Sequence, residues 1–193
     1  MINVAIFVSG NGTNCENIIR HFTDHKNVKI ALVLSNKIDA YALTRARNLG
    51  VPAIVMTHNH FNDESQMMVL MRAYHIDFIV LAGFLQMIPD FLIRAYDHRI
   101  LNIHPALLPK FGGKGMYGHY VHEAVKAAGE TETGMTVHWV NSVCDGGEII
   151  AQFHTPLSPT DSPADIAAKE HVLEQDYFPF VIEKVLSHSF SPS

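Results

Sequence analysis

Residues 4–14 read Val4-Ala5-Ile6-Phe7-Val8-Ser9-Gly10-Asn11-Gly12-Thr13-Asn14, an unbroken apolar run followed by a glycine turn. An apolar run that does not alternate with polar residues is typical of a strand buried on both faces of a parallel sheet. The turn is followed by Ile18, Ile19 and Phe22 at helical spacing, and then by a second apolar run from Ile30 to Leu34. The stretch therefore predicts a strand–helix–strand unit with parallel strands and a right-handed crossover.

The same pattern recurs downstream. A helical stretch over residues 40–49 precedes an apolar run at 53–56, and a Met-rich helical stretch over 67–74 precedes another at 78–81. A short strand at 99–101 leads into Asn102-Ile103-His104-Pro105, and a glycine-rich loop over 110–120, a candidate lid, follows. Two further runs, 135–140 and 148–153, flank Asp145-Gly146-Gly147 and predict an antiparallel pair.

The last element is predicted as a helix that begins at Ser162, a favourable cap, and Pro163, a favourable first residue. Pro179 is expected to kink or interrupt it. We predict a single α/β domain over residues 1–188, of three αβα layers, with a mostly parallel Rossmann-like sheet and a C-terminal antiparallel strand pair. Residues 189–193 are predicted to form a polar tail.

Composition favours small-molecule partners. The 193 residues are 17% charged and carry a formal net charge of -5, which does not indicate a nucleic-acid surface or a polybasic membrane anchor. No apolar run is long enough to span a bilayer, and the start has no basic leader, so we expect a cytoplasmic protein. Cys15 and Cys144 are expected to be free thiols. The oligomeric state, monomer or homodimer, stays open.

The glycine turn has the geometry of an anion site, because backbone N–H groups and the helix dipole meet where a strand enters a helix. The dinucleotide fingerprint would place a glycine or alanine at Cys15 and an acidic residue after the second strand, which here ends in Ser35-Asn36. The Gly-Lys-Ser/Thr ending of a nucleotide triphosphate loop is also missing. A phosphomonoester fits better, although a tight turn by itself can require glycine.

Asn102, His104 and Asp145 are the candidate catalytic residues. The glycine turn and the segment Asn102-Ile103-His104 are both predicted to follow strands directly, where ligands bind in open α/β sheets. A histidine beside a carboxylate, with an amide nearby, could stabilise the oxyanion of an acyl transfer. The alternative is that Asp145 is an ordinary turn residue and that Asn102 and His104 only satisfy loop backbone.

Four segments in this order carry a resemblance: residues 9–14, Leu81-Ala82-Gly83-Phe84, Leu101 to Pro109, and Asp145-Gly146-Gly147. They resemble the folate-dependent phosphoribosylglycinamide formyltransferases, and the similarity extends from Met1 to about Ile182. The resemblance implies transfer of the formyl group of 10-formyltetrahydrofolate to the amine of 5'-phosphoribosylglycinamide, a step of de novo purine biosynthesis. It implies a folate co-substrate, an imidazolium form of the catalytic histidine, and no metal.

The resemblance also implies residue roles. Asn102, His104 and Asp145 would be catalytic, Gly12, Thr13 and Asn14 would bind the substrate phosphate, and Glu174 would contact the glycinamide end. The folate site would be lined by Leu85, Gln86, Met87, Ile88, Asn102, Asn141, Val143 and Asp145. Gln86 stands where many relatives carry arginine, and the loop at 110–120 looks longer than the usual connection.

Three alternatives stay open. A hydrolase would use the same trio to release formate from formyl-folate, with water in place of the amine. A related formyltransferase would act on initiator tRNA or a nucleotide sugar. A noncatalytic module would bind folate or a phosphosugar without turnover. A metal site is not indicated, because the thirteen histidines do not fall at recognised ligand spacings.

Overall fold

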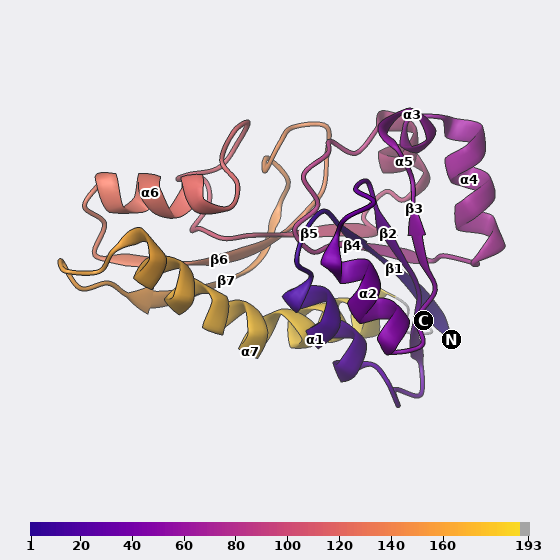
Figure 1. Ribbon diagram of the computed structural model, residues 1–193, viewed down its shortest axis with the longest axis horizontal. Helices are drawn as coiled ribbons and strands as arrows, with labels where there is room; N and C mark the ends of the chain where they lie inside the picture. Colours follow the sequence, from indigo (N-terminus) through magenta and orange to yellow (C-terminus); the bar gives the residue numbers. More distant parts are fainter. Residues whose placement is uncertain (190–193) are drawn as a thin grey trace. The chain divides into compact units, whose positions relative to one another are not determined.

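The structure is a computed structural model, and it describes residues 1–189 (Figure 1). All of the predicted polar tail except Ser189 lies outside the described residues. The chain divides into two compact units, one from Met1 to Asn102 and one that begins at Ile103. The two units are described in turn.

The first unit contains a parallel sheet. Its strands are β1 (Ile2–Val8), β2 (Val28–Ser35), β3 (Ala53–Val55), β4 (Phe78–Leu81) and β5 (Ile100–His104), in which the unit boundary falls. They lie in the order β3-β2-β1-β4-β5, and each neighbouring pair is parallel. Val4 to Val8 are fully buried, as expected for a central strand covered on both faces.

The helices of the first unit are α1 (Thr13–His21), α2 (Tyr41–Asn48), α3 (His58–Phe61), α4 (Glu64–Ala73) and α5 (Asp90–Ala95). Right-handed crossovers place α1 and α2 on one face, and the reversed strand order after β3 places α4 and α5 on the other. Helix α1 packs on α2, and α4 packs on α5. The sequence did not predict α3 and α5, which are only four and six residues long.

The second unit is built on an antiparallel pair, β6 (Glu132–Trp139) and β7 (Ile149–Pro156). Its helices are α6 (His119–Ala127) and α7 (Pro163–Ser189), the long yellow helix of Figure 1. Helix α7 packs against α6, β6 and β7. A buried cluster of Ala106, Val121, Val125 and Ile166 forms a core between the two helices and the segment after β5.

Two expectations for the second unit were incomplete. Helix α6 was not predicted: its first residues fall in the stretch read as a glycine-rich loop, and Gly118 caps it without a side-chain hydrogen bond. Pro179 does not interrupt α7, which continues to Ser189. Phe178, Val181 and Ile182 are buried around the proline, and their burial outweighs the one backbone hydrogen bond that it removes.

The start of α7 is as predicted. Ser162 Oγ accepts from the Asp165 N–H at 3.2 Å, and the Ser162 N–H donates to the Asp165 carboxylate at 2.8 Å. The fold class is also confirmed: the chain has an α/β fold with a parallel sheet and a C-terminal antiparallel pair. Cys15 and Cys144 are both free, as expected. None of the described helices is long and apolar enough to cross a membrane.

Replacement of Gly134 by alanine tests the packing of the second unit. A Cβ at Gly134 would collide with the Phe153 carbonyl of β7 and lie 2.7 Å from Leu107 Cδ2. We expect Gly134→Ala to lower the free energy of unfolding by about 1 to 3 kcal/mol, the usual cost of overpacking. Urea denaturation measures it, with Gly10→Ala as the control because no atom lies within 4 Å of a Cβ there. Equal stability of the two variants would contradict the packing described.

Candidate active site

The glycine turn between β1 and α1 is held by close contact with α2. Gly12 caps α1 in the left-handed region, with φ of 77°. A Cβ on Gly12 would collide with Ala42, whose N–H donates to the Gly10 carbonyl at 3.1 Å. Glycine is therefore required at position 12 for two reasons, its backbone conformation and the approach of α2. The first N–H groups of α1 have no acceptor within the helix and are oriented outward from its N-terminus.

Ser9 connects three segments of the first unit. Its Oγ donates to Asn36 Oδ1 at 2.7 Å and accepts from the Leu85 N–H at 2.9 Å. Asn36 Nδ2 in turn approaches Gln86 Oε1 at 3.5 Å. The predicted phosphate turn, the end of β2 and the predicted folate segment at 85–88 thus lie together at the carboxyl ends of the strands.

Arg45 is a residue of this region that the sequence did not indicate. Its Nε donates to the Asn11 carbonyl at 2.9 Å, and its guanidinium forms an ion pair with Glu16. The arginine sits on α2, so it fixes the turn from the same helix that contacts Gly12. An arginine in the last turn of a helix has too many ordinary explanations to be assigned this role from sequence.

The predicted folate residues of the first unit differ in exposure. Leu85 and Met87 are 51% and 54% exposed, whereas Ile88 is buried. Gln86 Nε2 is buried and has no hydrogen-bond partner among the described residues. Leu85 and Met87 therefore offer exposed apolar surface on either side of a glutamine whose amide nitrogen is enclosed.

Asn102 and His104 lie within β5, so the expectation that they directly follow the strand was wrong by a few residues. Strand pairing with β4 extends to Asn102, opposite Leu81. Because alternate residues of a strand face the same side, Asn102 and His104 share one face of β5 and Ile103 has the other. His104 is 3% exposed.

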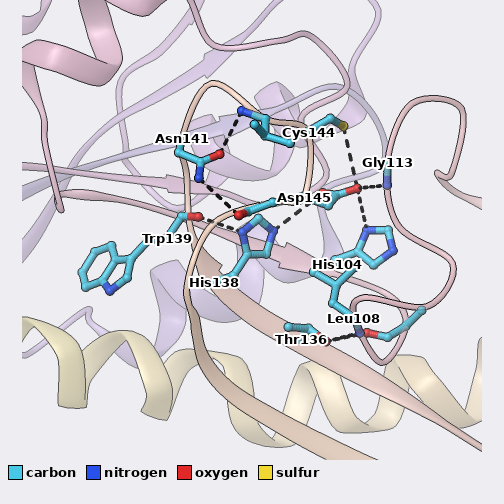
Figure 2. Close-up of polar contacts among 12 residues, drawn as sticks. His104, Leu108, Gly113, Thr136, His138, Trp139, Asn141, Cys144 and Asp145 are labelled. Carbon is cyan, nitrogen blue, oxygen red and sulfur yellow. Dashed lines mark hydrogen bonds and ion pairs between the residues drawn. The ribbon is translucent and has the colours of Figure 1, made fainter.

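His104 lies between two acceptors of the second unit, of which Figure 2 shows Asp145. Its Nδ1 is 3.5 Å from Asp145 Oδ2, and its Nε2 is 2.8 Å from the Phe111 carbonyl oxygen. A carbonyl only accepts, so Nε2 carries the hydrogen in that contact. The structure therefore brings together His104 and Asp145, 41 positions apart in the sequence, as the sequence predicted.

Asp145 is bordered by one backbone donor and two histidine rings. Its carboxylate accepts from the Gly113 N–H at 2.9 Å, and Oδ1 lies 3.6 Å from His138 Nε2 (Figure 2). Burial raises the pKa of Asp145, but the neighbouring His138, His104 and Gly113 N–H outweigh burial and hold the pKa below its ordinary value. Asp145 has a positive φ of 53°, a conformation that aspartate adopts more readily than most other residues that carry a Cβ. The side chain is thus a carboxylate oriented toward His104.

His138 is a neighbour of Asp145 that the sequence analysis missed. It is 2% exposed, and its Nδ1 contacts the Trp139 carbonyl at 2.8 Å, which leaves Nε2 for Asp145. The β6–β7 pairing shifts register between Val137 and His138, where β7 contributes one unpaired residue, Ile150. A polar residue within an apolar strand is the signal that could have identified it, since a buried histidine needs partners.

Thr136 fixes the loop that carries Phe111. Its Oγ1 donates to the Ala106 carbonyl at 2.6 Å and accepts from the Leu108 N–H at 3.0 Å. Gln152 of β7 adds a bond from Nε2 to the Leu108 carbonyl at 2.9 Å. The loop after β5 is therefore held by the antiparallel pair, and this places the Phe111 carbonyl against His104.

The loop between β6 and β7 is stabilised by its own side chains. Asn141 Oδ1 accepts from the Val143 N–H at 2.8 Å, and Asn141 Nδ2 donates to the Gly146 carbonyl at 3.2 Å. Val143 is 61% exposed. A Cβ on Gly147 would collide with the Trp139 carbonyl, so glycine closes the loop there. Asn141 orders the loop that carries Asp145, and Val143 presents an apolar surface.

Burial is the largest influence on the pKa of His104. Desolvation lowers the pKa of His104 below its ordinary value, even though Asp145 and the Phe111 carbonyl favour the charged ring. The neutral form is thus favoured in the structure as it stands, whereas the resemblance implied an imidazolium. Asp145 offsets part of the burial cost, which makes the charged form more accessible than it would be alone.

Glu174 is not on a solvated helix face. Its side chain is 13% exposed, and its Oε2 lies 3.2 Å from His171 Nδ1 on the same helix. Burial lowers the pKa of His122 on α6, and the opposing influence is the charge of Glu174. The charge of His104 also acts on His122, in the same direction as burial. Glu174, His122 and His104 are therefore electrostatic neighbours within the second unit.

Comparison with known proteins agrees with this geometry. The model of a family described as formyl transferase matches residues 2–182. The chain belongs to the formyl transferase family. A phosphoribosylglycinamide formyltransferase of Haemophilus influenzae is 37% identical over 95% of this chain and 86% of its own length. A chloroplastic protein of that name from Arabidopsis thaliana is 39% identical over 90% of this chain. The chain spans 61% of that relative's length.

Solved structures place the chain in the same group. The phosphoribosylglycinamide formyltransferase from Bacillus halodurans superposes with a TM-score of 0.87 at 31% identity, over 97% of this chain and 96% of its own. The glycinamide ribonucleotide transformylase 1 from Geobacillus kaustophilus gives a TM-score of 0.87 at 32% identity, over 96% of this chain and 99% of its own. The resemblance stated from the sequence is confirmed.

The electrostatic balance at His104 is testable by titration. We expect the pKa of His104 to lie below its ordinary value and to fall further in Asp145→Asn, because the variant keeps the burial and removes the opposing charge. NMR titration of the ring signals, assigned with His104→Gln, measures both values. A pKa in Asp145→Asn equal to or above that of the unaltered chain would show that Asp145 does not act on His104.

Proposed function

We propose that this chain transfers the formyl group of 10-formyltetrahydrofolate to the amine of 5'-phosphoribosylglycinamide, a step of de novo purine biosynthesis. The observation that carries the proposal is the contact of buried His104 with the Asp145 carboxylate, on the face of β5 that Asn102 shares. Acyl transfer to an amine needs a donor for the oxyanion and a group that moves a proton, and this set supplies both. The names of the relatives support the choice of substrates.

In the proposed mechanism the amine attacks the formyl carbon directly. The Asn102 amide and the His104 ring N–H stabilise the oxyanion of the tetrahedral intermediate, which takes the place of the Phe111 carbonyl as acceptor. No protein nucleophile is required. The attacking nitrogen loses a proton and folate N10 gains one as the C–N10 bond breaks, so no net proton is consumed.

Asp145 makes the proton transfer possible. His104 becomes an imidazolium when it takes up a proton, and burial disfavours that form. The carboxylate 3.5 Å from Nδ1 stabilises it, and His138 and the Gly113 N–H keep the carboxylate in place. As an imidazolium, with Nδ1 toward Asp145, His104 delivers its Nε2 proton toward the departing N10, directly or through water, and Nε2 then takes up the proton that the attacking nitrogen loses.

The remaining roles follow the resemblance. Gly12, Thr13 and Asn14 bind the phosphate at the start of α1, and Glu174 contacts the glycinamide end. Leu85, Gln86, Met87 and Ile88, together with Asn102, Asn141, Val143 and Asp145, bind the folate. We infer that residues 1–188 function as one formyltransferase domain, that small molecules are its partners and that it acts in the cytoplasm.

Deformylation assays test the proposed activity. Turnover of 10-formyltetrahydrofolate, followed optically, should require phosphoribosylglycinamide and should fall by about 10²- to 10³-fold or more in His104→Ala, since an oxyanion donor is lost. His154→Ala, on the exposed edge of β7, is the matched control and should keep full activity. Formate release that does not depend on the amine would instead identify a hydrolase, and binding of both ligands without turnover would identify a binding module.

The phosphate role is tested at Gly12. Gly12→Ala forces a Cβ into α2 and strains the left-handed cap, so the N–H groups of the turn shift. We expect the KM for phosphoribosylglycinamide to rise by about tenfold or more, as when a hydrogen bond to a charged group is lost. The KM for the folate should stay within the error of the measurement.

Gly50→Ala is the control for this variant. Gly50 also has a positive φ, of 74°, but no atom lies within 4 Å of its Cβ position. The Gly50→Ala variant therefore shows the effect of backbone strain alone, without displacement of the glycine turn. If Gly12→Ala and Gly50→Ala have the same KM, the turn does not bind the phosphate.

A further inference from the structure

Glu170 on α7 is an unusual buried residue. It is 3% exposed, and its Oε1 has no hydrogen-bond partner among the described residues. Its other interaction is a side-chain hydrogen bond with Glu174, one helical turn further along. Two carboxyl groups can share a hydrogen bond only when one of them carries a proton.

Of the two carboxyl groups that share this hydrogen bond, Glu170 is the one that carries the proton. An ionised carboxylate with one oxygen buried and unsatisfied would carry a large desolvation penalty, whereas a neutral acid with an unpaired carbonyl oxygen carries a smaller one. Burial, then the charge of Glu174 and the hydrogen bond to it, raise the pKa of Glu170 well above its ordinary value. Glu174 is the more exposed of the two and accepts a second contact, from His171.

The titratable groups on α7 and on the elements packed against it have the following neighbours. On α6, His122 faces Glu174. On α7, His171 lies 3.2 Å from Glu174, and this contact raises the pKa of His171. On β6 and β7, Glu132 lies 3.4 Å from His154, and His138 contacts Asp145. Lys169, next to Glu170 in sequence, is bound to Asp161.

We propose that Glu170 is a positioning residue: as a neutral acid it donates a hydrogen bond to Glu174 and orients that carboxylate toward a donor group of the phosphoribosylglycinamide. The inference rests on the proposed function and on the contact of Glu174 with the glycinamide end. The pair holds a single negative charge, so Glu174 stays available as an acceptor for the substrate. When Glu170 ionises, the hydrogen bond is lost and two like charges face each other on α7.

The kinetic test compares two substitutions. Glu170→Gln keeps an N–H donor and cannot ionise, so its KM for phosphoribosylglycinamide should match the unaltered chain at neutral pH. Glu170→Leu removes the donor, and its KM should rise by about tenfold, as for a lost hydrogen bond to a charged group. The kcat and the KM for the folate should change little in either variant. Asp176→Asn removes an exposed carboxyl of the same helix and is the control.

The pH profile separates this role from a purely structural one. In the unaltered chain the KM for phosphoribosylglycinamide should rise as the pH passes through the raised pKa of Glu170, because the donor is lost. In Glu170→Gln that rise should be absent. A profile that is the same in both chains, or a KM that Glu170→Leu leaves unchanged, overturns the inference.

Two readouts do not depend on activity. Infrared spectra at neutral pH should show the carbonyl stretch of a buried protonated carboxyl that Glu170→Gln lacks. The raised pKa also means that the stability contributed by neutral Glu170 is complete below the ordinary value of 4.5 and is lost as the pH rises through the folded value. Urea denaturation should therefore show Glu170→Gln gaining on the unaltered chain as the pH rises, and no such gain would contradict the neutral acid.

Failure of the positioning role of Glu170 can be distinguished from failure of the proposed function. Turnover of the unaltered chain is measured first, and no transfer to phosphoribosylglycinamide overturns the proposed function and this role with it. Transfer by the unaltered chain, with no effect of Glu170→Leu on its KM, overturns the positioning role alone.

Discussion

The largely buried carboxylate of Asp145, whose side chain is 11% exposed, is the constraint on which the second unit's site depends. A carboxylate removed from water needs polar partners, and Asp145 has three: the Gly113 N–H donates to it, and ring nitrogens of His104 and His138 lie 3.5 and 3.6 Å away. Each partner comes from a different segment, namely the glycine-rich loop, β5 and β6. The glycine-rich loop, strand β6 and the turn after Cys144 therefore act together to supply the partners that the Asp145 carboxylate requires. This arrangement also leaves His104 beside a negative charge, which the proposed transfer uses.

In this unit burial disfavours the charged forms of the titratable side chains, and neighbouring groups determine the direction of the resulting pKa shift. The pKa values of His104 and His122 are lowered by burial against the influence of nearby carboxylates. The pKa of Asp145 is held down because its neighbours outweigh burial, while that of Glu170 is raised by burial first and then by the neighbouring carboxyl group of Glu174. The result is a set of groups whose protonation can change with small changes in surroundings, as proton transfer requires.

Much of the fold follows from local pattern. The apolar runs at 4–8, 30–34 and 78–81 became β1, β2 and β4 because strands of a parallel sheet must be apolar on both faces. Ser162 and Pro163 marked the start of α7 because capping is a local interaction. Short helices such as α3, and the passage of α7 through Pro179, could not be predicted in this way, since tertiary burial decides them.

The sequence by itself determined the order of the strands and of helices α1, α2, α4 and α7, the place of the glycine turn, the candidates Asn102, His104 and Asp145, and the family. These features depend on residue type and on spacing along the chain. Only the tertiary structure decided that His138 supports Asp145, that Arg45 and Ser9 hold the glycine turn, that burial favours neutral His104, and that Glu170 donates to Glu174. Each of these depends on which groups are removed from water together. That is set by packing between segments far apart in sequence, and no local pattern records it.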